Sequence, residues 1–203
     1  MLTDDQIKNN RDRFLELINS IKVEGANLSG LIKWLDNSDF FFAPASTKYH
    51  SAYAGGLCEH SLNVYDALCR LVEEYKDKLP NEISEDSIKI VSLMHDVSKT
   101  NFYELYYRNV KNDETGIWEK VPEYRTKDAK DRFILGSHEQ NAEYIAHTFF
   151  PLSAEESSAI LHHHAGASWD SAQDDFSAVY SKYPLAILLH MADFIATFLY
   201  ERD

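Results

Sequence analysis

The sequence contains little that points to an exported, membrane-spanning or disulfide-bonded protein. Its N-terminus has neither a basic nor an apolar segment, so we expect no signal peptide. No apolar run approaches the roughly 18 residues of a membrane span. The two cysteines, Cys58 and Cys69, do not form a C-x-x-C pair, and we expect them to be reduced thiols in the core. These absences predict a cytoplasmic protein that does not bind membranes.

Positive charge is also scarce. The chain has 20 Lys and Arg residues against 33 Asp and Glu residues, which gives a formal net charge of −13. A negative field of this size repels nucleic-acid backbones at long range. We therefore expect no long nucleic-acid partner, although a local cationic pocket is compatible with this charge.

The length and composition fit one folded unit. The 203 residues, 44% of them hydrophobic, are enough to bury a sizeable core. We find no internal repeat, linker or low-complexity segment. We expect a single domain over residues 1–203, in which residues 1–50 form N-terminal helices and a loop and residues 51–203 form the functional core.

Hydrophobic residues recur at helical spacing along most of the chain. Thr3 or Asp4 is expected to cap the first helix, and Ser153 a later one that ends at 165–166. Residues 169–177 are expected to form a loop. Helices are predicted near residues 4–21, 28–35, 58–75 and 84–95, and from about 138, 153 and 184 onward.

Residues 102–126 differ from the rest. Tyr and Val are frequent there, and residues 112–116 form a turn cluster. We predict a β-hairpin with strands near 104–111 and 117–124, in which Pro122 would need an edge position. The predicted fold class is therefore mainly α, with a small inserted hairpin.

Histidine and aspartate residues occur at intervals along the predicted helices. The most informative is the adjacent pair His95-Asp96. Imidazole and carboxylate groups together bind divalent metals such as Mn, Fe, Co, Ni or Zn. Asp193 lies in an otherwise apolar helix, where a buried carboxylate is costly unless it is paired or bound to a metal. The full series predicts a buried centre for one or two ions: His60, His95, Asp96, His138, the triplet His162–His164 and Asp193.

Some of the histidines have simpler explanations. Consecutive residues of the triplet spread around a helix, so we expect His163 and His164 to be ligands and His162 to be the spare. His147 is expected at the surface or in the core. His190 either orients the site or packs in the core, and His50 is either a loop residue or part of a phosphate contact.

These residues resemble the HD-domain superfamily of metal-dependent phosphohydrolases, whose pattern H…HD…D is matched by His60, His95-Asp96 and Asp193. The resemblance covers roughly residues 50–200 and implies a helical bundle with the metals at its centre. The additional histidines match the binuclear branch of the superfamily. Five segments in order are similar to the HD domain of bacterial 3′→5′ exoribonucleases: residues 55–61, 95–99, 136–138, 162–164 and 189–193.

The resemblance implies which residues carry the chemistry. One ion would be held by His60, His95, Asp96 and Asp193, and a second by Asp96, His138, His163 and His164, the metals being Mn, Fe, Co or Ni. Metal-activated water would hydrolyse a small phosphorylated substrate: a nucleotide, a phosphomonoester or a short oligonucleotide. Asp96 would bridge the ions, and Lys99 would neutralise a phosphate oxygen. Weaker expectations are substrate contacts from Lys48 and Arg108, and orienting roles for Glu59 and Glu139.

The chain also departs from these relatives. Residues 165–169 stand where HD-GYP phosphodiesterases have Gly-Tyr-Pro, which argues against a cyclic di-GMP phosphodiesterase. The hairpin is expected to be a lid, a homo-oligomer contact or plain surface structure. Two other functions stay open. A di-iron oxygenase, like myo-inositol oxygenase, would show oxygen-dependent turnover with iron alone, and a non-catalytic nucleotide sensor would bind nucleotide without releasing product.

Overall fold

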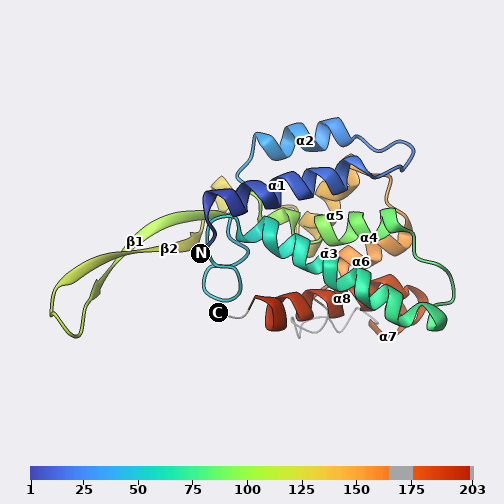
Figure 1. The fold of residues 1–203 in the computed structure, drawn as a ribbon. Helices are drawn as coiled ribbons and strands as arrows, with labels where there is room; N and C mark the ends of the chain where they lie inside the picture. Colours follow the sequence, from blue (N-terminus) through green and yellow to red (C-terminus); the bar gives the residue numbers. More distant parts are fainter. Residues whose placement is uncertain (165–175, 202–203) are drawn as a thin grey trace.

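Helices predominate in the computed structural model of the chain, which describes residues 1–164 and 176–201 (Figure 1). Helix α3 is the longest, and it packs against both α4 and α8, while α6 contacts α5 and α8. Helices α1 and α2 lie along one side of this bundle (Figure 1). The described helices are α1 (Asp4–Asn19), α2 (Leu28–Asp36), α3 (Gly56–Tyr75), α4 (Glu85–Met94), α5 (His138–Phe149), α6 (Ala154–Leu161), α7 (Phe176–Lys182) and α8 (Pro184–Ile195).

Side-chain capping determines where several helices begin. The Thr3 hydroxyl accepts a hydrogen bond from the backbone N–H of Gln6, and the Gln6 side chain accepts one from the backbone N–H of Thr3. The same capping box begins α5 at Ser137 and α6 at Ser153. Such caps satisfy amide groups that have no partner within the helix. They confirm the predicted helix starts, with Thr3 rather than Asp4 as the first cap.

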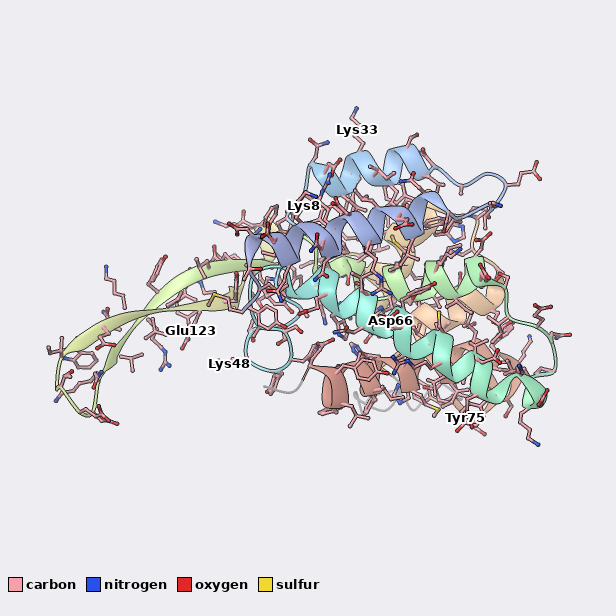
Figure 2. The ribbon with its side chains drawn as sticks, in the orientation of Figure 1. Lys8, Lys33, Lys48, Asp66, Tyr75 and Glu123 are labelled. Atoms are coloured by element: carbon pink, nitrogen blue, oxygen red, sulfur yellow. The ribbon has the colours of Figure 1, made fainter. Side chains whose placement is uncertain are left out.

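The core consists mainly of apolar side chains from seven of the eight described helices, joined by Phe40, Phe41 and Phe150 from the connecting segments. Each buried Leu, Ile or Phe contributes about 1.5–3 kcal/mol relative to an exposed one. Charged side chains such as Lys8 and Lys33 lie on the outer surface of α1 and α2 (Figure 2). Fully buried members of the core include Phe14, Ile18, Leu31, Leu35, Leu57, Leu68, Ile90, Leu93, Ile160 and Leu189.

The predicted hairpin is confirmed. Strands β1 (Tyr103–Lys111) and β2 (Trp118–Thr126) pair antiparallel over their full length. Gly116 has a φ of +71° in the connecting turn, a conformation that favours glycine. Pro122 has no N–H to donate to a neighbouring strand. It has the edge position that it needs, because both strands of a two-stranded sheet are edges. The hairpin projects away from the helices (Figure 1).

Two predicted boundaries were wrong. Helix α6 ends at Leu161, not at 165–166, and residues 162–164 form a turn in which the ring Nδ1 of His163 bonds the Ile160 carbonyl at 2.6 Å. Residues 176 and 177 begin helix α7 and are not a loop. The remainder of that predicted loop lies outside the described residues.

The C-terminal segment passes back under α3. Helix α8 continues as a π-helical turn over Ala196–Tyr200, so the helix predicted from about residue 184 onward is confirmed. Over the described ranges no single helix has the length and apolar composition needed to cross a membrane. Helix α7 and the helical residues 184–200 reach that length and apolar composition only when they are taken together, and the chain bends by 107° between them.

Candidate metal centre

Seven histidine and aspartate side chains meet inside the bundle, where several helices begin or end. His60, His95, Asp96, His163 and Asp193 are at most 5% exposed. The other two side chains, His138 and His164, are 25% and 32% exposed, so the cluster opens toward solvent on their side. The residues come from near the start of α3 (His60), the end of α4 (His95, Asp96), the start of α5 (His138), the turn after α6 (His163, His164) and α8 (Asp193).

The start of α3 is set by a close backbone approach. Gly55 has a φ of +85°, and a Cβ on Gly56 would lie 2.1 Å from the carbonyl oxygen of Ser51. Only glycine fits at position 56 without moving the loop that precedes the helix. This contact places His60, one turn further along α3, beside the same loop.

One half of the cluster is fully buried. His60 Nε2 lies 3.3 Å from His95 Nε2 and 3.2 Å from Asp193 Oδ1. Ligand atoms of these three residues all lie within 4.8 Å of one another, a separation that one metal ion can span. The other half contains His138, His163 and His164, whose ligand atoms are equally close.

Asp96 lies between the two halves. Its Oδ1 is 2.6 Å from His138 Nε2, and its Oδ2 is 3.5 Å from His60 Nε2. Each oxygen therefore faces a different half of the cluster, which is the arrangement expected of a carboxylate that bridges two ions. Lys99, which lies on the next turn of the chain, donates a hydrogen bond from Nζ to Oδ2 of Asp96 at 2.6 Å.

Each of the five imidazole rings is held from behind through its Nδ1 atom. With Nδ1 engaged in this way, Nε2 is left to point into the cluster, the orientation that histidine ligands of metals adopt. The Nδ1 partners are Glu201 Oε1 at 2.9 Å from His60, the Ser92 carbonyl at 2.8 Å from His95, Ser98 Oγ at 2.6 Å from His138, the Ile160 carbonyl at 2.6 Å from His163 and Glu139 Oε1 at 3.1 Å from His164.

The histidines carry different charges. Burial lowers the pKa of His95 to about 3, so this ring is neutral at pH 7. Burial also opposes the charge on His60, but hydrogen bonds to Asp193 and Glu201 raise its pKa to about 10. The pKa of His164 rises to about 9 against the same burial, through its bonds to Asp193 and a neighbouring glutamate. Without a metal, protons on two rings therefore balance the buried carboxylates.

The carboxylates stay ionised. Burial would raise the pKa of Asp96, but the charges of Lys99 and the adjacent histidines hold it well below its usual value. The pKa of Asp193 is low for a similar reason, because His164 and His60 bond it. Both groups therefore offer negative oxygens to a cation at neutral pH.

The donor set fits divalent transition metals. Nε2 of His163 is buried and has no hydrogen-bond partner among the described residues. It lies 3.7 Å from Asp96 Oδ1, which is too far for a hydrogen bond. Leaving a buried polar atom unpaired costs about 1–3 kcal/mol, and a metal ion would remove that cost. Five imidazoles with two carboxylates suit Mn, Fe, Co, Ni or Zn.

Of the other Glu, Lys and Arg residues predicted to orient ligands or to bind substrate, one contacts the cluster and the others lie away from it. Glu139 bonds His164 as expected, whereas Glu59 accepts a hydrogen bond from the Tyr53 hydroxyl at 2.5 Å and not from a ligand. Lys48 and Arg108 line a separate cavity at the base of the hairpin.

The other histidines lie around the cluster. His147 is exposed and pairs with Glu143. His162 bonds the Ser158 carbonyl and packs against Phe176, away from the other two triplet rings. The ring of His190 bonds the His163 carbonyl at 2.6 Å and so supports the cluster without joining it. His50 packs its ring 4.8 Å from that of His60.

Two residues that orient the ligands were not indicated by the sequence. Glu201 lies 141 positions from His60, and no local pattern links the two. Ser98 lies within the segment 95–99 that resembles the HD-domain relatives, two positions after Asp96, and this position was the one available signal.

Comparison with known proteins identifies the family of the chain. The family model described as HD domain matches residues 57–196. Dihydroneopterin 2′,3′-cyclic phosphate phosphodiesterase of Methanocaldococcus jannaschii is 33% identical over 61 residues, which are 30% of this chain. The matched segment covers 24% of that relative, about a quarter of its length. No solved structure matches the chain significantly.

Proposed function

This chain belongs to the HD-domain family of metal-dependent phosphohydrolases, and we propose that it hydrolyses a phosphate ester of a small molecule at the cluster of seven side chains. One observation carries the proposal. Five imidazole Nε2 atoms and two ionised carboxylates converge on one partly open space, and each ring is held from behind. Apolar side chains in place of a buried charged cluster are often neutral or stabilising for a fold, so stability alone does not account for this donor set.

Two ions would fit the two halves of the cluster. His60, His95 and Asp193 would hold one, and His138, His163 and His164 the other, with Asp96 between them. Bound divalent metals lower the pKa of water to produce a nucleophile and bind phosphoryl oxygens as negative charge develops. Mn, Fe, Co and Ni are the candidates.

Lys99 supplies a fixed positive charge beside Asp96. Its side chain is 12% exposed, and its Nζ lies 2.6 Å from Asp96 Oδ2. The neighbouring carboxylate keeps the lysine protonated against the effect of burial, which would lower its pKa. The ammonium group has three N–H donors, so one can hold Asp96 while another binds a phosphate oxygen of the substrate.

Access favours a small substrate. The cluster opens beside His138 and His164, the two partly exposed ligands, while the other five side chains are buried. A net charge of −13 also disfavours a long polyanion, because such ligands bind through many cationic contacts. The similarity to an enzyme named for a 2′,3′-cyclic phosphate makes a small phosphodiester the first substrate to test.

A metal-reconstitution screen tests the proposal. The full chain is stripped with a chelator, reloaded separately with Mn, Fe, Co or Ni, and assayed with 2′,3′-cyclic nucleotides, nucleoside monophosphates and nitrophenyl phosphate mono- and diesters. We expect phosphate-ester cleavage that needs the metal. Absence of cleavage across all metals and substrates would overturn the proposal, and oxygen-dependent turnover with iron alone would replace it with an oxygenase.

A further inference from the structure

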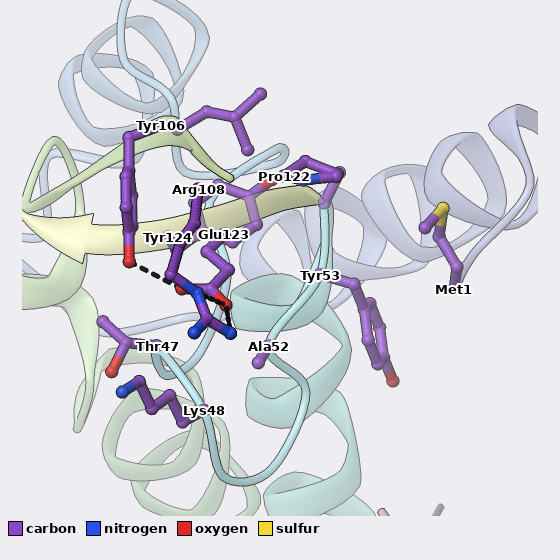
Figure 3. Close-up of a pocket in the computed structure, with 12 residues that line it drawn as sticks. Met1, Thr47, Lys48, Ala52, Tyr53, Tyr106, Arg108, Pro122, Glu123 and Tyr124 are labelled. Carbon is purple, nitrogen blue, oxygen red and sulfur yellow. Dashed lines mark hydrogen bonds and ion pairs between the residues drawn. The ribbon is translucent and has the colours of Figure 1, made fainter. Parts of the chain in front are cut away.

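A cavity lies at the base of the hairpin, apart from the metal cluster. Its volume is about 550 Å³, within the range of small-molecule sites. One wall comes from β1 and β2, and the other comes from the loop of residues 47–54 (Figure 3). Among the described residues, the side chains that line it include none of the seven in the metal cluster.

The walls of this hairpin cavity offer flat aromatic surfaces. Tyr53, Tyr106 and Tyr124 line it together with Pro122. The hydroxyl of Tyr106 donates to Glu123 Oε2 at 2.6 Å, which holds that ring in place (Figure 3). Aromatic side chains bind planar heterocycles by stacking, at about 1–3 kcal/mol per base.

The same cavity carries an excess of positive charge. Arg108 lines it and is fixed by Glu123 Oε1, 2.8 Å from Nε and 2.7 Å from one terminal nitrogen. Lys48 also lines it and forms no ion pair with any residue that the structure describes. Two cations therefore face one carboxylate, on a molecule that is acidic overall. Such a place favours an anionic group.

We propose that the hairpin cavity binds a nucleotide-like ligand, with its planar ring against the tyrosines and its phosphate at Lys48 and Arg108. In Figure 3 the Lys48 ammonium and the Arg108 guanidinium both lie on the side of the lining opposite to Tyr53. This assignment does not depend on the hydrolytic function, since the residues involved are separate from the metal cluster.

The loop that forms one wall also reaches the metal centre. Ser51 donates to Glu201 Oε2 at 2.7 Å, and Glu201 holds His60. Tyr53 lines the cavity, and its hydroxyl lies 3.4 Å from Ser51 Oγ. A ligand in the hairpin cavity would therefore contact the loop that bonds Glu201. It would not contact the metal cluster itself.

Calorimetric titration of the full chain with AMP, adenosine and inorganic phosphate tests the assignment, before and after chelation. We expect AMP to bind at least tenfold more tightly than adenosine or phosphate alone, because both halves of the site are needed. Chelation should leave that affinity unchanged. Equal affinities for AMP and phosphate, loss of AMP binding on chelation, or no binding at millimolar AMP would each overturn the proposal.

Matched variants locate the ligand. Lys48→Gln and Tyr106→Ala should each weaken AMP binding about tenfold. Lys120→Gln and Tyr107→Ala make the same changes at exposed hairpin positions that do not line the cavity, and they should leave binding intact. Tyr106→Phe keeps the ring but loses the bond to Glu123, so it should retain most of the affinity. Equal losses in the lining and control variants would reject the site.

Discussion

The metal centre and the hairpin are both rich in polar contacts, but their surroundings differ. At the centre, Asp96 is 1% exposed and touches Lys99 and several histidines. On the hairpin, the Arg125–Glu104 pair leaves 61% and 41% of the two side chains exposed. Removing one partner of a buried charged cluster leaves the others without compensation, whereas exposed partners return to water. The same kind of contact therefore has very different consequences in the two regions.

The largest effect is expected from Asp96→Ala. Asp96 contacts both halves of the cluster, so its loss should lower hydrolysis at least about 10²–10³-fold. Elemental analysis should show reduced metal content, while circular dichroism should retain most of the helical signal. Asp131→Ala, at an exposed position, is the control. Activity within tenfold of the unsubstituted protein would rule out the bridging role.

Glu201→Gln should have the next largest effect. It removes the charge that holds His60 Nδ1, and orienting groups of this kind contribute about 10–100-fold to metal affinity or activity. Competition with a metal-sensitive dye measures the affinity. Glu82→Gln, an exposed change of the same kind, should have none of this effect. Unchanged metal affinity in Glu201→Gln would show that the His60 contact is incidental.

Lys99→Ala should separate substrate chemistry from metal binding. Loss of its charge-assisted hydrogen bond should lower turnover about 10–100-fold, whereas metal content stays the same. Steady-state kinetics together with elemental analysis tests this, with the exposed Lys130→Ala as control. Loss of metal in Lys99→Ala would mean that the lysine serves the cluster and not the substrate.

Metal uptake should release protons. In the metal-free protein the pKa values of His60 and His164, about 10 and about 9, keep both rings protonated at pH 7.5. Because a metal must displace these protons, its affinity should rise with pH up to that range. The stability that the raised pKa values give the metal-free protein is fully present below pH 6.5 and lost as pH rises through about 9–10. Titration calorimetry in buffers of different ionisation enthalpy counts the protons released when the metal binds. Metal binding at pH 7.5 without proton release would contradict this prediction.

The smallest effect is expected on the hairpin. Arg125→Ala should change the free energy of unfolding by less than about 1 kcal/mol, because the pair with Glu104 is exposed. Urea denaturation measures this change. A loss above about 2 kcal/mol would mean that the hairpin is buried against another surface, and would remove the contrast with the metal centre.

Much of the fold follows from local sequence. Helix starts at Thr3, Ser137 and Ser153 depend on residues three positions apart, and the hairpin depends on a turn cluster between alternating strands. The end of α6 was mispredicted because the chain turns at residues 162–164, before the 165–166 pair at which the sequence suggests an end. Helix α7 was missed, because it is only seven residues long and none of them is fully buried, so the periodic signal is weak.

The sequence by itself determined the donor types of the candidate centre, because His60, His95-Asp96 and Asp193 have the types and order of metal ligands. It also favoured His163 and His164 over His162, since consecutive side chains cannot share one direction. The tertiary structure turns His163 and His164 inward and packs His162 against Phe176, in agreement with that choice. It also supplied Glu201 and the hairpin cavity, because contacts between distant segments depend on how the helices and loops pack and not on local spacing.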